Sequence, residues 1–173
     1  MQLDPDLVAL QEVRDNVARA RAACEAVHDY SQAQIDRVCE AMASAASAAA
    51  YDLAKLAVEE TGIGRVHYKV LKNLFGSEGT WKSIQDEKTV GIIRRDEQRG
   101  IVEIATASGV VASIIPTTNP TSTAMFKALI ALKARNAIVI SPHPRAVKCI
   151  AATVDCVFEA ARKAGAPADC VTC

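Results

Sequence analysis

The chain has 173 residues and is 50% hydrophobic, so it can bury a substantial core as a globular protein. Lysine plus arginine and aspartate plus glutamate number 20 each, which argues against a nucleic-acid-binding protein or one that binds anionic membranes. No apolar run approaches the roughly 20 residues that cross a bilayer, and we therefore expect a cytoplasmic protein without a membrane partner.

The chain begins with a pattern typical of an amphipathic helix. Asp4 and Pro5 have the residue types of an N-cap and of a first helical position. Apolar residues then recur at steps of three and four as far as Val27. We therefore predict one long helix with a continuous apolar stripe.

Two further helices are predicted before residue 88. Ser31 and Gln34 have the spacing of a capping box, and the apolar stripe after them continues to Thr61, where a glycine follows. This pattern predicts a single second helix. A third helix is predicted from about Arg65, and its apolar side consists of Val66, Val70, Leu71, Leu74 and Phe75.

Beyond residue 88 the hydrophobic period changes to that of strands. Residues 90–95 and 101–105 flank a polar five-residue segment, which predicts an antiparallel hairpin. The nearly continuous apolar run 110–115 is typical of a strand buried on both faces, and Pro120 then opens a helix. Residues 137–140 repeat the strand pattern, followed by a helix to Lys163 and the start of another strand.

This order predicts an α/β fold with three parts, because alternating strands and helices form parallel sheets with right-handed crossovers. Residues 1–88 form an N-terminal helical layer, residues 89–107 an antiparallel hairpin of the kind used in oligomers, and residues 108–173 the first part of a Rossmann-like parallel sheet that binds cofactor.

The segment Pro116-Thr117-Thr118-Asn119 joins the first parallel strand to its helix. Ligands of open parallel sheets bind beyond the carboxyl ends of the strands. Free backbone N–H groups, hydroxyls and the Asn119 amide would there form a cluster of neutral donors for a phosphate, a carboxylate or a developing oxyanion. The alternative is that Thr118 or Asn119 only caps the helix.

Gly109–Arg145 resembles the first cofactor-binding unit of the aldehyde dehydrogenase superfamily, and in detail its CoA-acylating branch. The resemblance is greatest to the aldehyde dehydrogenase half of bifunctional aldehyde-alcohol dehydrogenases. Asp86–Gly91 and Ala164–Pro167 are similar to the same proteins in the expected order. The likeness extends from about Thr61 to the end of the chain, which makes it much more specific than a single short motif.

The resemblance implies two groups of cofactor-binding residues. The group expected near the nicotinamide consists of Ile115, Pro116, Thr117, Thr118 and Asn119. The group expected near the adenosine ribose consists of Ser141, His143 and Pro144. Both groups follow predicted strands.

Two departures from the family pattern affect these assignments. Non-acylating members carry Pro-Trp-Asn-Phe-Pro, and aligning the prolines places Thr118 at the family's oxyanion-binding asparagine, with Asn119 one residue later. The expected oxyanion donor is therefore Asn119 or Thr118. A serine, Ser141, replaces the family's ribose-binding lysine, which leaves the choice between NAD and NADP open.

The function implied is that of the N-terminal cofactor-binding portion of an NAD-dependent, CoA-acylating aldehyde dehydrogenase. Such an enzyme converts a short aldehyde, CoA and NAD into acyl-CoA and NADH. Acetaldehyde is the expected substrate, and sulfoacetaldehyde and succinic semialdehyde are the alternatives. No cysteine here matches the context of the family's nucleophile, so we expect a truncated chain that is inactive alone. The parent enzyme is expected to be a homo-oligomer.

Other interpretations concern binding modules and the remaining polar residues. The chain could be a non-catalytic module that binds nucleotide or associates with other subunits through its hairpin. The spacing of Cys170 and Cys173 occurs in redox and zinc motifs, but no second Cys/His pair completes a metal site, and we predict none. His143 is expected in a loop near cofactor, whereas His28 and His67 are expected on solvated helix surfaces.

Overall fold

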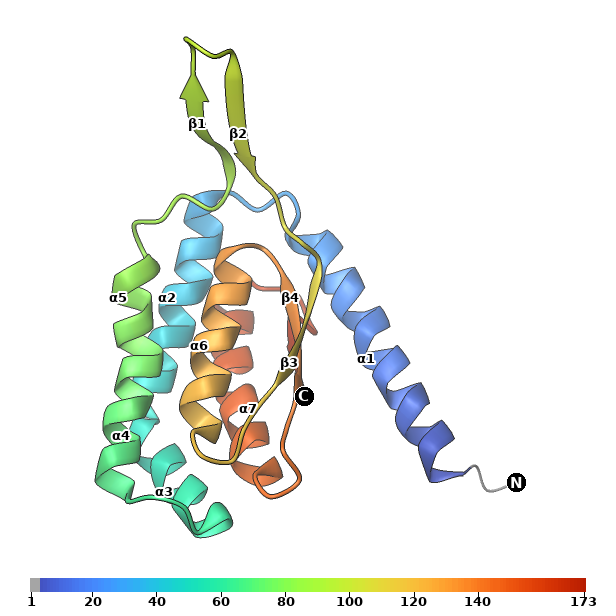
Figure 1. Cartoon of the computed structure of the whole chain (residues 1–173), viewed down its shortest axis with the longest axis vertical. Helices are drawn as coiled ribbons and strands as arrows, with labels where there is room; N and C mark the ends of the chain where they lie inside the picture. The colour runs from blue at the N-terminus through green and yellow to red at the C-terminus, as the bar shows by residue number, and fades with distance from the viewer. Residues whose placement is uncertain (1–3) are drawn as a thin grey trace.

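The chain consists of helices, then a hairpin, then alternating strands and helices (Figure 1). The computed structural model describes residues 4–173, so residues 1–3 of the expected helical layer lie outside it. The helices are α1 (Pro5–Val27), α2 (Gln32–Ala48), α3 (Ala50–Thr61), α4 (Val66–Leu74), the π-helical turn η1 (Phe75–Gly79), α5 (Thr80–Ile84), α6 (Pro120–Lys133) and α7 (Val147–Lys163). The strands are β1 (Gly91–Asp96), β2 (Ile101–Ala105), β3 (Val110–Ile114), β4 (Ala137–Ser141) and β5 (Val171–Thr172).

The predicted parallel sheet is present, with the strand order β3-β4-β5. Helices α6 and α7 lie on one side of this sheet, and α1 crosses the other (Figure 1). The prediction that β3 is buried on both faces is wrong, because Ser113 is buried whereas Ile114 is 80% exposed. The physical reason is that β3 is an edge strand and the buried part of α1 begins only at Ala20.

The second predicted helix is two helices. The capping box is confirmed, since the Gln34 N–H donates to the Ser31 hydroxyl and the Ser31 N–H donates to the Gln34 side chain. The chain leaves helical geometry at Ala49, where φ is −85° and ψ is 4°. This break changes the direction of the chain, so that α3 contacts both α4 and α7. Gly62 ends α3 with a positive φ of 68°, as predicted.

Helix α4 is rotated from the predicted orientation, so that Val66, Val70 and Leu74 of the predicted apolar side are only half-buried. Leu71 and Phe75 of the predicted apolar side are 62% and 78% exposed, whereas the buried residues of α4 are Lys69 and Asn73. The Asn73 amide explains this orientation because it joins three helices. It donates to the carbonyl of Ala50 at 2.9 Å and accepts from the hydroxyl of Thr121 at 2.7 Å.

A second buried polar connection joins α2, α5 and α6. The ammonium of Lys133 donates to a carboxylate oxygen of Asp36 at 2.7 Å and to the carbonyl of Gln85 at 2.9 Å. It also lies 5.3 Å from the centre of the Trp81 ring, within the range of a cation–π interaction. Lys133 is therefore buried with its charge balanced.

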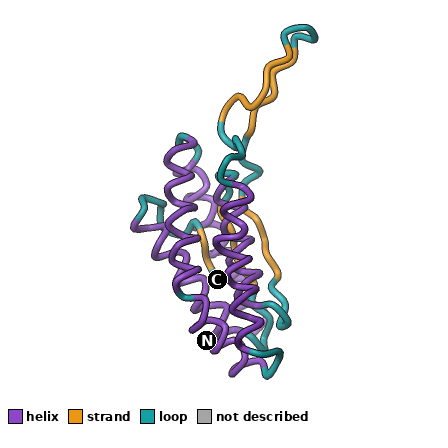
Figure 2. The backbone as a smooth tube through the Cα atoms, turned by 90° about the vertical axis from the view of Figure 1, so that its left-hand side faces the viewer, coloured by secondary structure: helices purple, strands orange, loops and turns teal. Residues whose placement is uncertain are grey.

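The predicted hairpin of β1 and β2 is confirmed, and it projects from the helical part of the molecule (Figures 1 and 2). Two residues between α6 and β4, Arg135 and Asn136, form hydrogen bonds with the backbone at the base of the hairpin. The Arg135 guanidinium donates to the carbonyls of His28 and Ala105. The Asn136 side chain accepts from the backbone N–H groups of Ser108 and Gly109 at 2.7 and 2.9 Å. Among residues 4–173, no helix has the length and apolarity needed to cross a bilayer.

The start of α7 is capped by a side chain from a distant helix. One carboxylate oxygen of Glu60 accepts from the N–H of Lys148 at 2.8 Å, and the other accepts from the N–H of Cys149 at 2.7 Å. Burial alone would raise the pKa of Glu60, but these hydrogen bonds outweigh it and hold the pKa below its ordinary value of 4.5. Glu60 thus neutralises the first turn of α7.

We predict that Glu60→Gln destabilises the chain by about 1 kcal/mol at pH 7, because the helix loses a charged cap. The folded pKa of Glu60 is lowered, so its contribution is complete above 4.5 and is lost as the pH falls through the folded pKa. Urea unfolding should be measured at pH 7 and at about pH 3.5, which is roughly one unit below the ordinary pKa of a glutamate. The difference in free energy of unfolding between Glu60→Gln and the unaltered chain should be smaller at the lower pH. Glu59→Gln, on the exposed side of α3, is the matched control, and an equal loss in both variants would contradict the capping role.

The contact between η1 and α6 leads to a second stability prediction. A Cβ atom added at Gly76 would lie 2.7 Å from the carbonyl oxygen of Ser122, whereas one added at Gly79 would meet nothing closer than 3.4 Å. Gly76→Ala should therefore destabilise the chain by about 1–3 kcal/mol through overpacking. Gly79→Ala should be neutral or stabilising by up to about 1 kcal/mol, because alanine is the better helix former. Equal urea midpoints for the two variants would show that the close contact does not exist.

Candidate functional site

Strands β3 and β4 end at the same edge of the sheet. Ile114 pairs with Ser141, and the Ile115 N–H donates to the Ser141 carbonyl at 3.1 Å. The loop after β3 and the loop after β4 therefore leave this edge side by side. Both groups of predicted cofactor-binding residues lie here, which is where ligands of parallel sheets bind.

The predicted site residues differ in exposure. Ile115 is fully buried and supports the loop from the core, whereas Thr117 and Asn119 are half-buried. The residues exposed at this edge are Pro116, Thr118, Ser141, His143 and Pro144. The His143 ring accepts a hydrogen bond from the Arg145 N–H at 3.1 Å, which fixes the second loop.

Asn119 does not cap α6. Its side chain makes no capping hydrogen bond, and its side-chain oxygen instead accepts a hydrogen bond from the Lys72 ammonium at 2.8 Å. An ammonium can only donate, so the Asn119 oxygen must face Lys72 and its NH2 group faces elsewhere. The start of α6 thus keeps unpaired backbone N–H groups beside a side-chain donor. This arrangement suits an oxyanion.

Thr118 is held through its backbone rather than its side chain. Its carbonyl oxygen accepts from the Lys69 ammonium at 3.0 Å, and its side chain is exposed. Lys69, Lys72 and Asn73 all contact the segment Thr118–Thr121, but none of them is among the predicted site residues. Their spacing of three and four residues on one helix was the signal that could have identified them.

A groove with a volume of about 670 Å³ lies on one side of Asn119, between α4, η1 and the start of α6. Its walls are largely apolar, with Leu71, Phe75 and Phe126 among the lining residues, and hydroxyls of Ser122 and Thr123 line it as well. This groove could hold a small, mainly apolar molecule next to the Asn119 amide.

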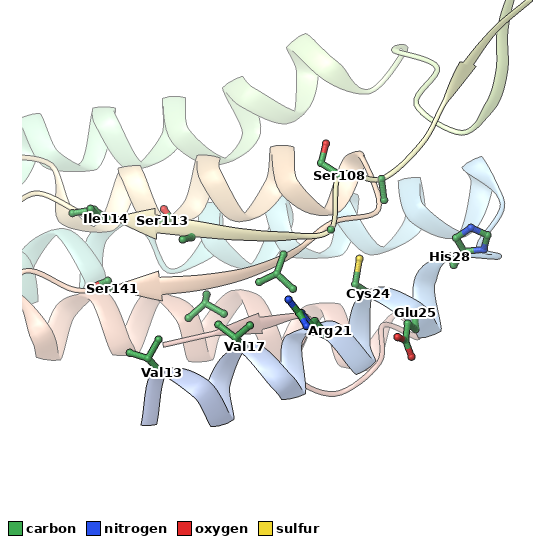
Figure 3. Close-up of a pocket in the computed structure, with 15 residues that line it drawn as sticks. Val13, Val17, Arg21, Cys24, Glu25, His28, Ser108, Ser113, Ile114 and Ser141 are labelled. Carbon is green, nitrogen blue, oxygen red and sulfur yellow. The ribbon is translucent and has the colours of Figure 1, made fainter. Parts of the chain in front are cut away.

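A hollow of similar size, about 690 Å³, lies between α1 and the exposed face of the sheet (Figure 3). Val13, Val17 and Arg21 from α1 line it together with Ser113 and Ile114 of β3. None of residues 116–119 lines this hollow. Ser141, at the end of β4, does line it, so the hollow reaches one of the two predicted groups of cofactor-binding residues.

Five of the six cysteines have thiols whose pKa is raised by burial. Burial raises the pKa of Cys39, Cys149 and Cys170 to about 12, and it also raises the pKa of Cys156 and Cys173. Thiols with raised pKa values stay protonated at neutral pH and react slowly. Within residues 4–173, no group of three or more His, Cys, Asp and Glu side chains could hold a metal ion.

Residues 6–173 match the aldehyde dehydrogenase family. The bifunctional aldehyde-alcohol dehydrogenase AdhE of Escherichia coli K12 is 46% identical over 160 residues, which cover 92% of this chain and 18% of that protein. A probable aldehyde dehydrogenase from Listeria monocytogenes EGD-e superposes with a TM-score of 0.97 at 46% identity, covering 99% of this chain and 38% of that one.

An acetylating aldehyde dehydrogenase from Geobacillus thermoglucosidasius superposes with a TM-score of 0.94 at 54% identity, over 97% of this chain and 37% of that one. The chain thus spans between 18% and 38% of the length of these three relatives. The family match and the agreement in structure confirm the resemblance of Gly109–Arg145, and this chain belongs to the aldehyde dehydrogenase family.

Proposed function

We propose that this chain forms the nicotinamide-facing part of an NAD-dependent, CoA-acylating aldehyde dehydrogenase. The parent reaction converts a short aldehyde, CoA and NAD into acyl-CoA and NADH, or the reverse. The observation that carries the proposal is the Asn119 amide, whose oxygen is held by Lys72 beside the uncapped start of α6. A donor that is fixed before the reaction stabilises negative charge developing on a substrate oxygen.

The residues at the strand ends fit a dinucleotide. When bound, NAD supplies the hydride acceptor. Ile115–Asn119 would face the nicotinamide and Ser141, His143 and Pro144 the adenosine ribose, and neither loop contains an acidic residue.

Asn119 is our candidate for the oxyanion donor, with Thr118 as the second. A cysteine thiolate attacks the aldehyde carbon, and the carbonyl oxygen takes up the negative charge of the tetrahedral adduct. The Asn119 NH2 group would donate to this oxygen. Burial raises the pKa of the Cys39, Cys149 and Cys170 thiols to about 12, so we propose none of these three as the nucleophile.

Acetaldehyde is the proposed substrate. The groove beside Asn119 is mainly apolar, with Leu71 and Phe75 among its walls, and this favours a short uncharged aldehyde. Sulfoacetaldehyde and succinic semialdehyde are the alternatives, and Lys72, which also lines the groove, is a positive charge that could pair with their anionic groups.

A second candidate function is association with another copy of this chain through the hairpin. The observation in its favour is a set of exposed apolar side chains on both strands: Ile93, Ile101, Val102 and Ile104. Exposed apolar groups on a projecting hairpin are stabilised when a partner covers them. Sedimentation of the chain before and after Ile104→Lys would test this, and an unchanged sedimentation coefficient would count against it.

The first prediction on function concerns the 173-residue chain itself. Titration with NAD, followed by amide chemical shifts, should perturb Asn119 and Ser141 together, because the two loops leave the sheet side by side. Purified chain should form no acyl-CoA from acetaldehyde, CoA and NAD, since none of its cysteines matches the context of the family's nucleophile. Turnover by the pure chain, or NAD shifts confined to other regions, would contradict the proposal.

The second prediction distinguishes the two oxyanion candidates in an active enzyme. A chimera would carry this chain in place of the matching part of the Geobacillus acetylating enzyme, which superposes on 97% of it. Asn119→Ala should lower kcat by about a hundredfold, the usual effect of removing one oxyanion donor. Thr118→Ala is the matched comparison and should lower kcat by less than about threefold, which is well below the loss expected when one oxyanion donor is removed. The reverse order would assign the donor to Thr118.

A further inference from the structure

Two lysines are buried in this molecule, and their surroundings differ. Lys133 is 2% exposed and bonds to the Asp36 carboxylate, so its charge is balanced. Lys69 is 4% exposed, yet its ammonium has one hydrogen bond, to the carbonyl oxygen of Thr118. An ammonium has three donors, and among residues 4–173 the Lys69 ammonium has no second hydrogen-bond acceptor. Lys69 therefore has a strong tendency to bind an anion.

The surroundings of Lys69 are positive. Within the described residues 4–173, no carboxylate lies within 4.0 Å of the charged groups of Lys69, Lys72 or Arg65. Burial, followed by the charge of Lys72, lowers the pKa of Lys69 from its ordinary value. Three cations thus lie together without a counter-ion from the protein.

These cations line a cavity. It has a volume of about 550 Å³ and lies between the loop that joins α3 to α4 and the turn after β3. Arg65, Lys69, Lys72 and Asn119 are among its lining residues. Gly64 also lines it, and a Cβ atom added there would lie 3.4 Å from Cε and 3.9 Å from Nζ of Lys69. These are ordinary van der Waals distances, so Gly64 lies directly beside the ammonium, and its positive φ of 82° favours glycine.

We propose that Lys69, Lys72 and Arg65 form a binding site for an oxyanion, namely a phosphate, sulfonate or carboxylate group. Tetrahedral and planar oxyanions accept several hydrogen bonds from ammonium and guanidinium groups, which is the chemistry this cavity offers. Because Lys72 also holds Asn119, the oxyanion belongs to a molecule that reaches the same turn. This last step, but not the site itself, rests on the proposed function.

Two sources could supply such a group. A nucleotide cofactor, CoA or NAD, carries phosphates, and a short anionic aldehyde carries a carboxylate or a sulfonate. The shared chemistry is an oxyanion near Asn119, and separate titrations distinguish the sources.

The test is a titration of the ¹⁵N-labelled 173-residue chain with inorganic phosphate. We expect saturable shifts of the Gly64 and Thr118 amides, which lie on opposite sides of the cavity. Lys69→Met should weaken phosphate binding about ten- to a hundredfold, the effect of one charge-assisted hydrogen bond. Lys72→Met keeps Lys69 in place and should also weaken binding, so the test does not depend on the folding of one variant. Lys55→Met, an exposed lysine on α3, is the matched control and should leave the affinity unchanged.

Parallel titrations with CoA, NAD and succinate identify the source. The ligand whose affinity falls in Lys69→Met carries the oxyanion. Absence of saturable phosphate shifts, or equal affinity in Lys69→Met, Lys72→Met and the unaltered chain, would overturn the site. If the affinity for phosphate depends on Lys69 but the affinity for CoA, NAD and succinate does not, the inference that the oxyanion belongs to a molecule reaching Asn119 is wrong. The proposed function has its own test: it is wrong if NAD causes no amide shifts at Asn119 and Ser141, whatever the result with phosphate.

Discussion

The site depends on the packing of the polar side of α4 against the turn between β3 and α6. Asn73 joins this helix to α3 and to the first turn of α6 through two buried hydrogen bonds. With that contact made, Lys69 reaches the carbonyl of Thr118 and Lys72 reaches the side chain of Asn119. A buried amide that loses its partners destabilises a fold by about 1–3 kcal/mol, so Asn73 specifies how α4 is rotated. The exposed position of Phe75 follows from the same rotation.

Helices α6 and α7 begin at the same edge of the sheet, but the hydrogen bonding of their first turns differs. The first turn of α7 is filled by the Glu60 carboxylate, which comes from α3. The first turn of α6 has no side-chain cap, because Lys72 binds the oxygen of the residue in the N-cap position, Asn119. Backbone N–H groups that the protein leaves unpaired can be satisfied by a ligand, whereas those at α7 are already satisfied. Only the start of α6 is therefore available for negative charge.

The hairpin and the sheet are connected through residues that also limit their movement. Arg135 has a positive φ of 58°, an uncommon backbone conformation for a residue with a side chain, and its guanidinium reaches both the end of α1 and the end of β2. Asn136 fixes the chain between β2 and β3. The hairpin therefore projects in a defined direction even though few other residues contact it (Figure 2).

The sequence alone determined those features that depend on neighbouring residues. The capping box at Ser31, the glycine end of α3, the hairpin and the strand–turn–helix unit around Asn119 follow from local patterns, because each is stabilised by residues close in sequence. Only the tertiary structure decided which side of α4 is buried, where α2 ends and α3 begins, and which carboxylate caps α7. The partners in those cases lie far apart in sequence: Glu60 is 88 residues from Lys148 and Lys69 is 49 residues from Thr118. Hydrophobic periodicity placed Leu71 and Phe75 on the buried side of α4 in place of Lys69 and Asn73, since it ranks side chains by polarity and does not register the hydrogen bonds that allow polar groups to be buried.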